Sequence, residues 1–269
     1  MKQSSEGDIA KRIQPVAEVG AGLSCLFYGR AGTGKTALSS TFPKPLLLLD
    51  ILQNGTDTIA KVQGVDVLKV KRWEDLEEIY WYLSKGKGKE KYKSVVVDQI
   101  TEAQDVCMSY VKGDNDDDMI SKRMWGEISG EMKKLILNYR DLINLDKNVV
   151  FLAHERASDG DDAIEDQIDP TIGPRVMPSV AGFLNGAVAV IGNTFIRERF
   201  KHVNNKRVRM VDYAMRIGPH AYYTTKVRHP VGVDTPDVVV NPNFEKIMAI
   251  VKGRYQQPVA KKKVVKHGK

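Results

Sequence analysis

Cysteine is scarce in this sequence, with only Cys25 and Cys107 among 269 residues. Each lies in an apolar or helical stretch, and neither has the spacing of a metal-binding motif. A cysteine-ligated metal site and a framework of disulfides are therefore excluded. We predict that both residues are reduced thiols in the core of a cytosolic protein.

Long hydrophobic runs are also missing. The opening segment, "MKQSSEGDIAKRIQ", contains acidic residues and no apolar stretch of the kind found in signal peptides. No later run is long enough to cross a bilayer. The sequence therefore predicts a protein without a secretion signal or a membrane span, located in the cytoplasm.

Acidic residues are absent from the closing segment, "PVAKKKVVKHGK", which contains five lysines. The formal net charge of +7 is concentrated there, because the rest of the chain has 36 basic residues against 34 acidic ones. We expect residues 257–269 to form a disordered basic tail. Such a tail either adds weak, salt-sensitive affinity for nucleic acid or serves only solubility.

The sequence does contain an alternation of short apolar runs and helical patterns such as "WEDLEEIYWYLSKG". The runs are "LSCLFYG", "PLLLLD" (45–50), "VDVLKV" (65–70), "SVVVD" (94–98) and "NVVFLAH" (148–154). Each is apolar on both faces, as the strands of a covered parallel sheet are. The alternation predicts an α/β fold with a mainly parallel central sheet and helices on both faces, and the tryptophans are expected to lie in its core.

The pattern changes after His154. Residues 155–179 are polar and interrupted by prolines, which predicts a loop or lid. Beyond them, "GAVAVIGNTFIRERF", "KRVRMVDYAMRIG" and "AYYTTKVR" alternate as antiparallel strands do, and "NPNFEKIMAIVKGRY" predicts a last helix. There is no internal repeat. One domain over residues 21–256, after an N-terminal extension of residues 1–20, is the simplest organisation for this length.

A glycine-rich loop carries the clearest chemistry. It matches the phosphate-binding P-loop pattern G-x-x-x-x-G-K-[ST] with Gly29, Arg30, Ala31, Gly32, Thr33, Gly34, Lys35 and Thr36. Such a loop surrounds a polyphosphate with backbone N–H groups, and only glycine lets the main chain approach closely enough. Lys35 would face the β- and γ-phosphates of ATP, and the Thr36 hydroxyl would bind Mg²⁺.

Asp98 is the candidate for a second Mg²⁺ ligand. It ends the apolar run "SVVVD", the position from which a Walker B carboxylate contacts the metal or its waters. Alternatively, Asp98 could cap the helix that follows it. The next residue is Gln99 and not the glutamate that AAA-type ATPases place there, which favours a RecA-like site.

The order of these segments resembles that of the RecA superfamily. The P-loop, "LLLLD", "SVVVD", "NVVFLAHE" and a strand ending in "TKVR" follow one another over residues 22–253. The chain is most similar to the RecA-like P-loop ATPases of bacteriophages, some of which act as single-strand DNA recombinases. The resemblance implies ATP and Mg²⁺ as cofactors, single-stranded DNA as a partner, and a ring or filament of identical subunits in the host cytoplasm. A single-strand DNA-binding protein is a further candidate partner.

The same resemblance assigns roles to three residues. His154, at the end of a strand beside Asp98, matches the polar residue that senses the γ-phosphate and signals to the DNA-binding loops. Lys226 and Arg228 match a Lys-x-Arg pair that reaches the neighbouring subunit's nucleotide and would stabilise transition-state charge there. Two residues apart on a strand, they share a face. The simpler interpretations are an ordinary strand-end histidine and a solvated basic strand face.

One expected catalytic group is missing. RecA-like ATPases carry a glutamate just after the second strand, where this chain has Leu52 and Gln53. Asp50 could orient the attacking water instead, and Gln53 could position it without removing a proton. Glu102, one helical turn after Asp98, is a more distant substitute. The sequence therefore predicts nucleotide binding and leaves hydrolysis open.

Two charged segments bear on partners. The basic run "RERFKHVNNKRVR" (197–209) predicts a hairpin with an Asn-Asn turn, which either lies along a phosphate backbone or is an exposed hairpin of ordinary charge. The acidic run "GDNDDD" (113–118) lacks the glycine and glutamate of an EF-hand and predicts a solvated loop.

Three function classes follow from these features. The favoured one is a DNA-stimulated ATPase acting on single-stranded DNA in phage recombination or replication. A nucleotide-gated binding protein with little hydrolysis is the alternative that the missing glutamate keeps open. A nucleotide kinase is disfavoured, because residues 155–179 offer only Arg156 and Arg175 where a kinase lid needs several arginines.

Overall fold

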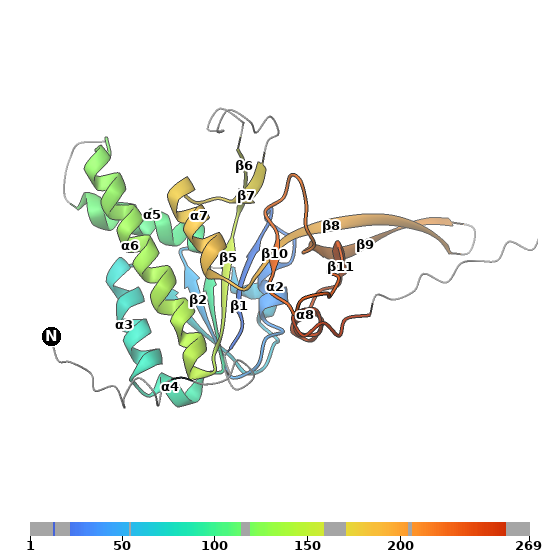
Figure 1. Cartoon of the computed structure of the whole chain (residues 1–269), viewed down its shortest axis with the longest axis horizontal. Helices are drawn as coiled ribbons and strands as arrows, with labels where there is room; N and C mark the ends of the chain where they lie inside the picture. The colour runs from blue at the N-terminus through green and yellow to red at the C-terminus, as the bar shows by residue number, and fades with distance from the viewer. Residues whose placement is uncertain are drawn as a thin grey trace, which may run out of the picture.

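The structure is a computed structural model that describes residues 13, 22–53, 55–113, 119–158, 171–203 and 206–256. The described residues form a nine-stranded central sheet with helices on both faces (Figure 1). The predicted basic tail, the predicted N-terminal extension apart from Ile13, and residues 114–118 of the acidic run lie outside the described residues.

The sheet has the strand order β11-β9-β8-β1-β5-β4-β2-β3, and β10 pairs with β8 outside this path. The strands are β1 (Ser24–Tyr28), β2 (Leu46–Ile51), β3 (Val65–Val70), β4 (Ser94–Asp98), β5 (Asn148–Ala153), β8 (Val190–Val203), β9 (Lys206–Arg216), β10 (Lys226–Val227) and β11 (Val238–Val240). Strands β8, β1, β5, β4, β2 and β3 run parallel, whereas β9, β10 and β11 are antiparallel to their partners. This arrangement confirms the predicted mainly parallel sheet with an antiparallel C-terminal extension.

Helices cover the two faces of the sheet unequally (Figure 1). One face packs against α3 (Trp73–Ser84), α5 (Ile100–Lys112), α6 (Lys122–Asp141) and α7 (Pro178–Ala187). The other packs against α2 (Lys35–Ser39) and α8 (Phe244–Val251). Short turns of helix complete the set: α4 (Gly88–Lys91), η2 (Thr56–Ile59) and η3 (Leu142–Leu145). Within the described ranges, no helix has both the length and the apolar composition needed to cross a bilayer.

How deeply each strand is buried depends on the helices that pack against it. Strands β1, β2 and β4 are buried throughout, because helices lie above and below them. The expectation that residues 65–70 are covered on both faces is wrong: β3 is the edge strand, and its Val67 and Leu68 are 42% and 41% exposed. Of the three tryptophans predicted to lie in the core, only Trp73 is buried. Trp81 and Trp125 are 45% and 38% exposed, because they lie on the outer faces of α3 and α6.

The predicted loop or lid after His154 is partly regular structure. Strands β6 (Glu155–Ser158) and β7 (Thr171–Pro174) pair antiparallel, and α7 begins at Pro178. Two of the three prolines in this segment are compatible with regular structure, because Pro174 ends a strand and Pro178 occupies the first turn of a helix, where a missing N–H is tolerated. Residues 159–170 lie outside the described part of the chain.

Strands β8 and β9 form a long ribbon that extends away from the sheet (Figure 1). The first residues of β8 pair with β1, and the rest pairs with β9 from Asn193↔Arg216 to Val203↔Lys206. The hairpin predicted over residues 197–209 is therefore confirmed, while its Asn-Asn turn is outside the described residues. The returning strand β9 brings Tyr213 back toward the P-loop.

Candidate nucleotide-binding site

The P-loop connects β1 to α2 at the carboxyl edge of the parallel sheet, where ligands bind in open α/β sheets. Gly32 and Gly34 have φ of 77° and 85°, the left-handed region that glycine adopts without steric cost. A Cβ atom at Gly29 would lie 2.4 Å from the carbonyl oxygen of Thr194. The three motif glycines are thus required by backbone conformation or by close approach.

Lys35 lies inside the loop. Its side chain is buried, and its Nζ donates hydrogen bonds to the carbonyl oxygens of Gly29 at 2.9 Å and Arg30 at 3.0 Å. Burial lowers the pKa of Lys35, while the nearby carboxylates of Asp98 and Glu102 oppose that shift. The ammonium group is therefore held at the position from which it can face the phosphates of a nucleotide.

The side chains of Thr36 and Asp98 contact each other next to Lys35. The Thr36 hydroxyl donates to Asp98 Oδ2 at 2.9 Å, across 62 residues of sequence. Burial raises the pKa of Asp98 to about 6, and the hydrogen bond from Thr36 works against this shift. A hydroxyl and a carboxylate oxygen suit Mg²⁺, which prefers hard oxygen ligands. The predicted pair of metal ligands is thus brought together, and this donor set fits the metal.

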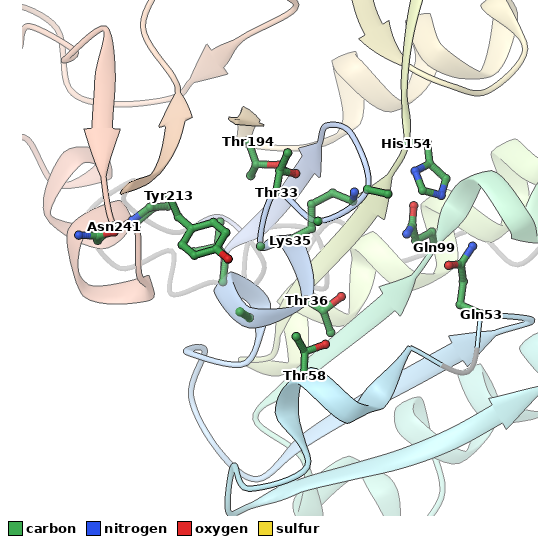
Figure 2. Close-up of a pocket in the computed structure, with 16 residues that line it drawn as sticks. Thr33, Lys35, Thr36, Gln53, Thr58, Gln99, His154, Thr194, Tyr213 and Asn241 are labelled. Atoms are coloured by element: carbon green, nitrogen blue, oxygen red, sulfur yellow. The ribbon is translucent and has the colours of Figure 1, made fainter. Parts of the chain in front are cut away.

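Lys35, Thr36 and the P-loop residues from Ala31 to Gly34 line a pocket of about 460 Å³, within the range of small-ligand sites. Figure 2 shows Lys35 and Thr36 in its middle, Gln53, Gln99 and His154 at one end, and Tyr213 and Asn241 at the other. The pocket therefore has two chemically different ends on either side of the phosphate loop.

The first end contains an acceptor without a partner. Gln99 Oε1 is buried and, among the described residues, receives no hydrogen bond. A water molecule in the pocket could donate to it. In the sequence Gln99 is notable only because it is not a glutamate, and nothing there indicates that it lies in the pocket wall.

The Glu102 carboxylate contacts both Gln53 and His154, the other two residues at this end of the pocket. It accepts a hydrogen bond from Gln53 Nε2 at 2.7 Å, and His154 Nε2 lies 3.4 Å from the same carboxylate oxygen. Burial raises the pKa of Glu102. Burial, followed by the positive charge of Lys35, lowers the pKa of His154, which favours its neutral form. Since Gln53 uses its amide N–H on Glu102, its carbonyl oxygen is left to orient a water.

Asp50, a predicted candidate for orienting the attacking water, lies next to Asp98. It is buried beside Asp98 on the neighbouring strand, with the register Asp50↔Asp98, and it is not among the residues that line the pocket. Its negative charge contributes to the raised pKa of Asp98. Gln53 and Gln99, in contrast, line the pocket.

Lys226 and Arg228 lie away from this pocket. Lys226 Nζ donates to the carbonyl oxygens of Asn185 and Gly186, and Arg228 Nη2 donates to that of Gly186. The pair shares one face, as predicted, and its local role is to satisfy carbonyl groups at the C-terminus of α7. A role toward a neighbouring subunit's nucleotide stays a prediction.

The comparison with known families agrees with this geometry. The AAA domain family matches residues 21–229, which include the P-loop, Asp98, His154 and the "TKVR" segment. No curated protein matches the chain. The family match supports a P-loop ATPase fold in general and does not support the narrower bacteriophage RecA-like group. Because the match spans well over half of the sequence, the chain belongs to the AAA domain family of P-loop nucleotide-binding proteins.

Proposed function

We propose that this chain is an ATP-dependent protein that acts on single-stranded DNA and hydrolyses ATP when DNA is bound. The P-loop pocket supports the nucleotide part of the proposal. The observation that carries the DNA part is a second hollow, which adjoins the Gln99–His154 end of that pocket. We call it the tryptophan groove.

The tryptophan groove measures about 450 Å³ and lies between α5, the start of α6 and the β6–β7 pair. Its lining residues are Thr101, Gln104, Asp105, Trp125, Arg156, Arg175, Val176, Met177 and Pro178. The half-exposed indole of Trp125 offers a face on which a nucleic-acid base can stack. Arg156 and Arg175 are exposed cations that suit the phosphates flanking such a base.

His154 links the groove to the nucleotide pocket. Its backbone N–H donates to Thr101 Oγ1 at 3.1 Å, and its carbonyl oxygen accepts from the Arg175 N–H at 2.8 Å. Both Thr101 and Arg175 line the groove, whereas the His154 side chain lines the nucleotide pocket. A ligand on either side therefore acts on the same short piece of backbone, which is a physical route for coupling ATP to DNA.

The proposed hydrolysis uses residues of this chain in the following way. Lys35 would bind the phosphates, and Thr36 with Asp98 would hold Mg²⁺, which would supply neutralisation of the phosphate charge. Gln99 Oε1 and Gln53 accept hydrogen bonds from a water at the γ-phosphate, and Glu102 keeps Gln53 in place. We also propose a ring or filament of subunits, for which the "TKVR" segment is the motivation.

The DNA part is tested by Trp125→Ala. Loss of one base stack is expected to weaken binding of a single-stranded oligonucleotide by about 5- to 150-fold, measured by fluorescence anisotropy. Trp81→Ala is the matched control, because Trp81 is equally exposed but lies on α3 outside the groove. If the two variants bind DNA equally, the groove does not hold the strand.

A further inference from the structure

The inference concerns the far end of the nucleotide pocket and rests on the proposed binding of ATP. This end is formed by Tyr213 of β9 and by Asn241 and Pro242, which follow β11. All three residues come from the C-terminal third of the chain, although the phosphate loop lies near the beginning. Figure 2 shows Tyr213 between Asn241 and the P-loop.

Tyr213 packs against the phosphate loop itself. A Cβ atom built at Gly34 would lie 3.0 Å from Cδ1 of the Tyr213 ring, so the ring lies directly beside the glycine that precedes Lys35. The side chain is nevertheless 47% exposed. One part of the ring therefore contacts the loop, and the rest faces the pocket.

Asn241 is fixed next to Tyr213 by backbone contacts. Its N–H donates to the Tyr213 carbonyl oxygen at 2.6 Å, and its own carbonyl oxygen accepts from Lys246 Nζ at 2.9 Å. Its φ is 47°, a left-handed conformation that asparagine tolerates better than most residues. Among the described residues, neither the Asn241 side-chain amide nor the Tyr213 hydroxyl makes a hydrogen bond, so both groups are available to a ligand.

The direction in which a nucleotide lies follows from the two ends of the pocket. Lys35, Thr36 and Asp98 fix the place of the phosphates and metal, and the acceptors Gln53 and Gln99 lie at one end. The γ-phosphate, where water attacks, must point toward those acceptors. The base must then lie toward Tyr213 and Asn241.

We propose that Tyr213 and Asn241 form the base-binding part of the site, with the Tyr213 ring stacked on a purine and the Asn241 amide reading its edge. An asparagine amide can donate to N7 and accept from the N6 amino group of adenine. Guanine has a carbonyl at the corresponding position, so the same amide cannot satisfy both contacts. The site therefore selects adenine nucleotides.

The stacking part is tested with Tyr213→Ala, Tyr213→Phe and two ligands, Mg-ATP and inorganic tripolyphosphate, titrated by calorimetry. Tyr213→Ala is expected to weaken ATP binding by about 5- to 150-fold and to leave tripolyphosphate binding unchanged, because only ATP has a base to stack. Tyr213→Phe keeps the ring and should bind both ligands as the wild type does.

Four outcomes would overturn the inference. Unchanged ATP binding by Tyr213→Ala would show that no base stacks there. Equal weakening of both ligands would show that Tyr213 only supports the loop. If the wild-type protein binds tripolyphosphate as tightly as ATP, the base makes no contribution to binding and there is no base site. If it binds neither ligand, the proposed function is contradicted as well.

The role of Asn241 in recognising the base is tested with Asn241→Gly. This substitution removes the side-chain amide, and glycine adopts the left-handed backbone conformation without strain. The ratio of ATP affinity to GTP affinity is expected to fall by at least about 5-fold. Asn241→Asp keeps the acceptor for the N6 amino group and loses the donor to N7, so ATP binding should weaken while adenine is still preferred over guanine, whose O6 the carboxylate repels. An unchanged ratio in Asn241→Gly would contradict a role for Asn241 in selecting adenine.

Discussion

Lys35→Ala is expected to weaken binding of Mg-ATP by about 30- to 5,000-fold. Truncating one partner of a buried, hydrogen-bonded charge pair typically costs about 2–5 kcal/mol, and Lys35 is buried in the centre of the pocket. The variant also loses the bonds from Nζ to the carbonyl oxygens of Gly29 and Arg30, which hold the loop in the described conformation. Calorimetric titration measures the change directly.

Lys61→Ala is the matched control for this prediction. Lys61 is exposed and lies outside the pocket, so its removal takes away the same charge without touching the loop. A thermal melt shows whether Lys35→Ala still folds. Equal ATP affinity in the wild type and a folded Lys35→Ala protein would mean that the pocket does not bind the phosphates at Lys35.

Asp98→Asn is expected to change two properties in opposite directions. Mg²⁺-dependent ATP turnover should be lost, because an amide is a far weaker Mg²⁺ ligand than a carboxylate. The metal-free protein should become more stable at pH 8, because the buried carboxylate no longer has to ionise. A residue that is costly to the fold and necessary for chemistry is typical of a functional site.

The pH dependence of that gain follows from the sign of the pKa shift. The fold raises the pKa of Asp98 from 3.8 to about 6, so the charged form is disfavoured in the folded state. The corresponding penalty, up to about 3 kcal/mol, develops as the pH rises from about 4 to about 6, stays constant above that, and is lost below pH 4. Denaturant unfolding at pH 8 and pH 4 in the absence of Mg²⁺ should therefore show a gain for Asp98→Asn only at pH 8.

Asp234→Asn serves as the control for this effect, because Asp234 is exposed and lies outside the nucleotide pocket. It should leave both turnover and stability nearly unchanged. If Asp98→Asn instead loses stability at pH 8, the ionised carboxylate stabilises the fold. Asp98 would then not be a metal ligand that lowers the stability of the metal-free protein.

Much of this architecture could be predicted from sequence, because its signals are local. The P-loop is one continuous segment. The mainly apolar runs predicted as strands up to Asp98 and His154 match β4 to its last residue and β5 to within one residue. Burial on both faces produces such runs, so the central sheet was predictable. The edge strand β3 has a similar composition but little cover, and periodicity alone does not reveal its position at the edge.

The missed residues depend on contacts between distant segments. Tyr213 follows Gly34 by nearly 180 residues and reaches it only because β9 returns along β8. Trp125 was expected in the core, but α6 turns it outward into a groove shared with the β6–β7 pair. Gln99 was overlooked because the motif specifies a glutamate at that position. Composition and spacing contain no signal for any of these three placements.

We expect ATP hydrolysis in this protein to respond to single-stranded DNA. Steady-state phosphate release by the wild-type chain, measured with saturating Mg-ATP in the absence and presence of a single-stranded oligonucleotide, tests it most directly. We expect a low basal rate of phosphate release that rises when the strand is added. In Trp125→Ala the rate should stay low at the same DNA concentration. A rate unaffected by single-stranded DNA, at concentrations where anisotropy shows the strand to be bound, would contradict it.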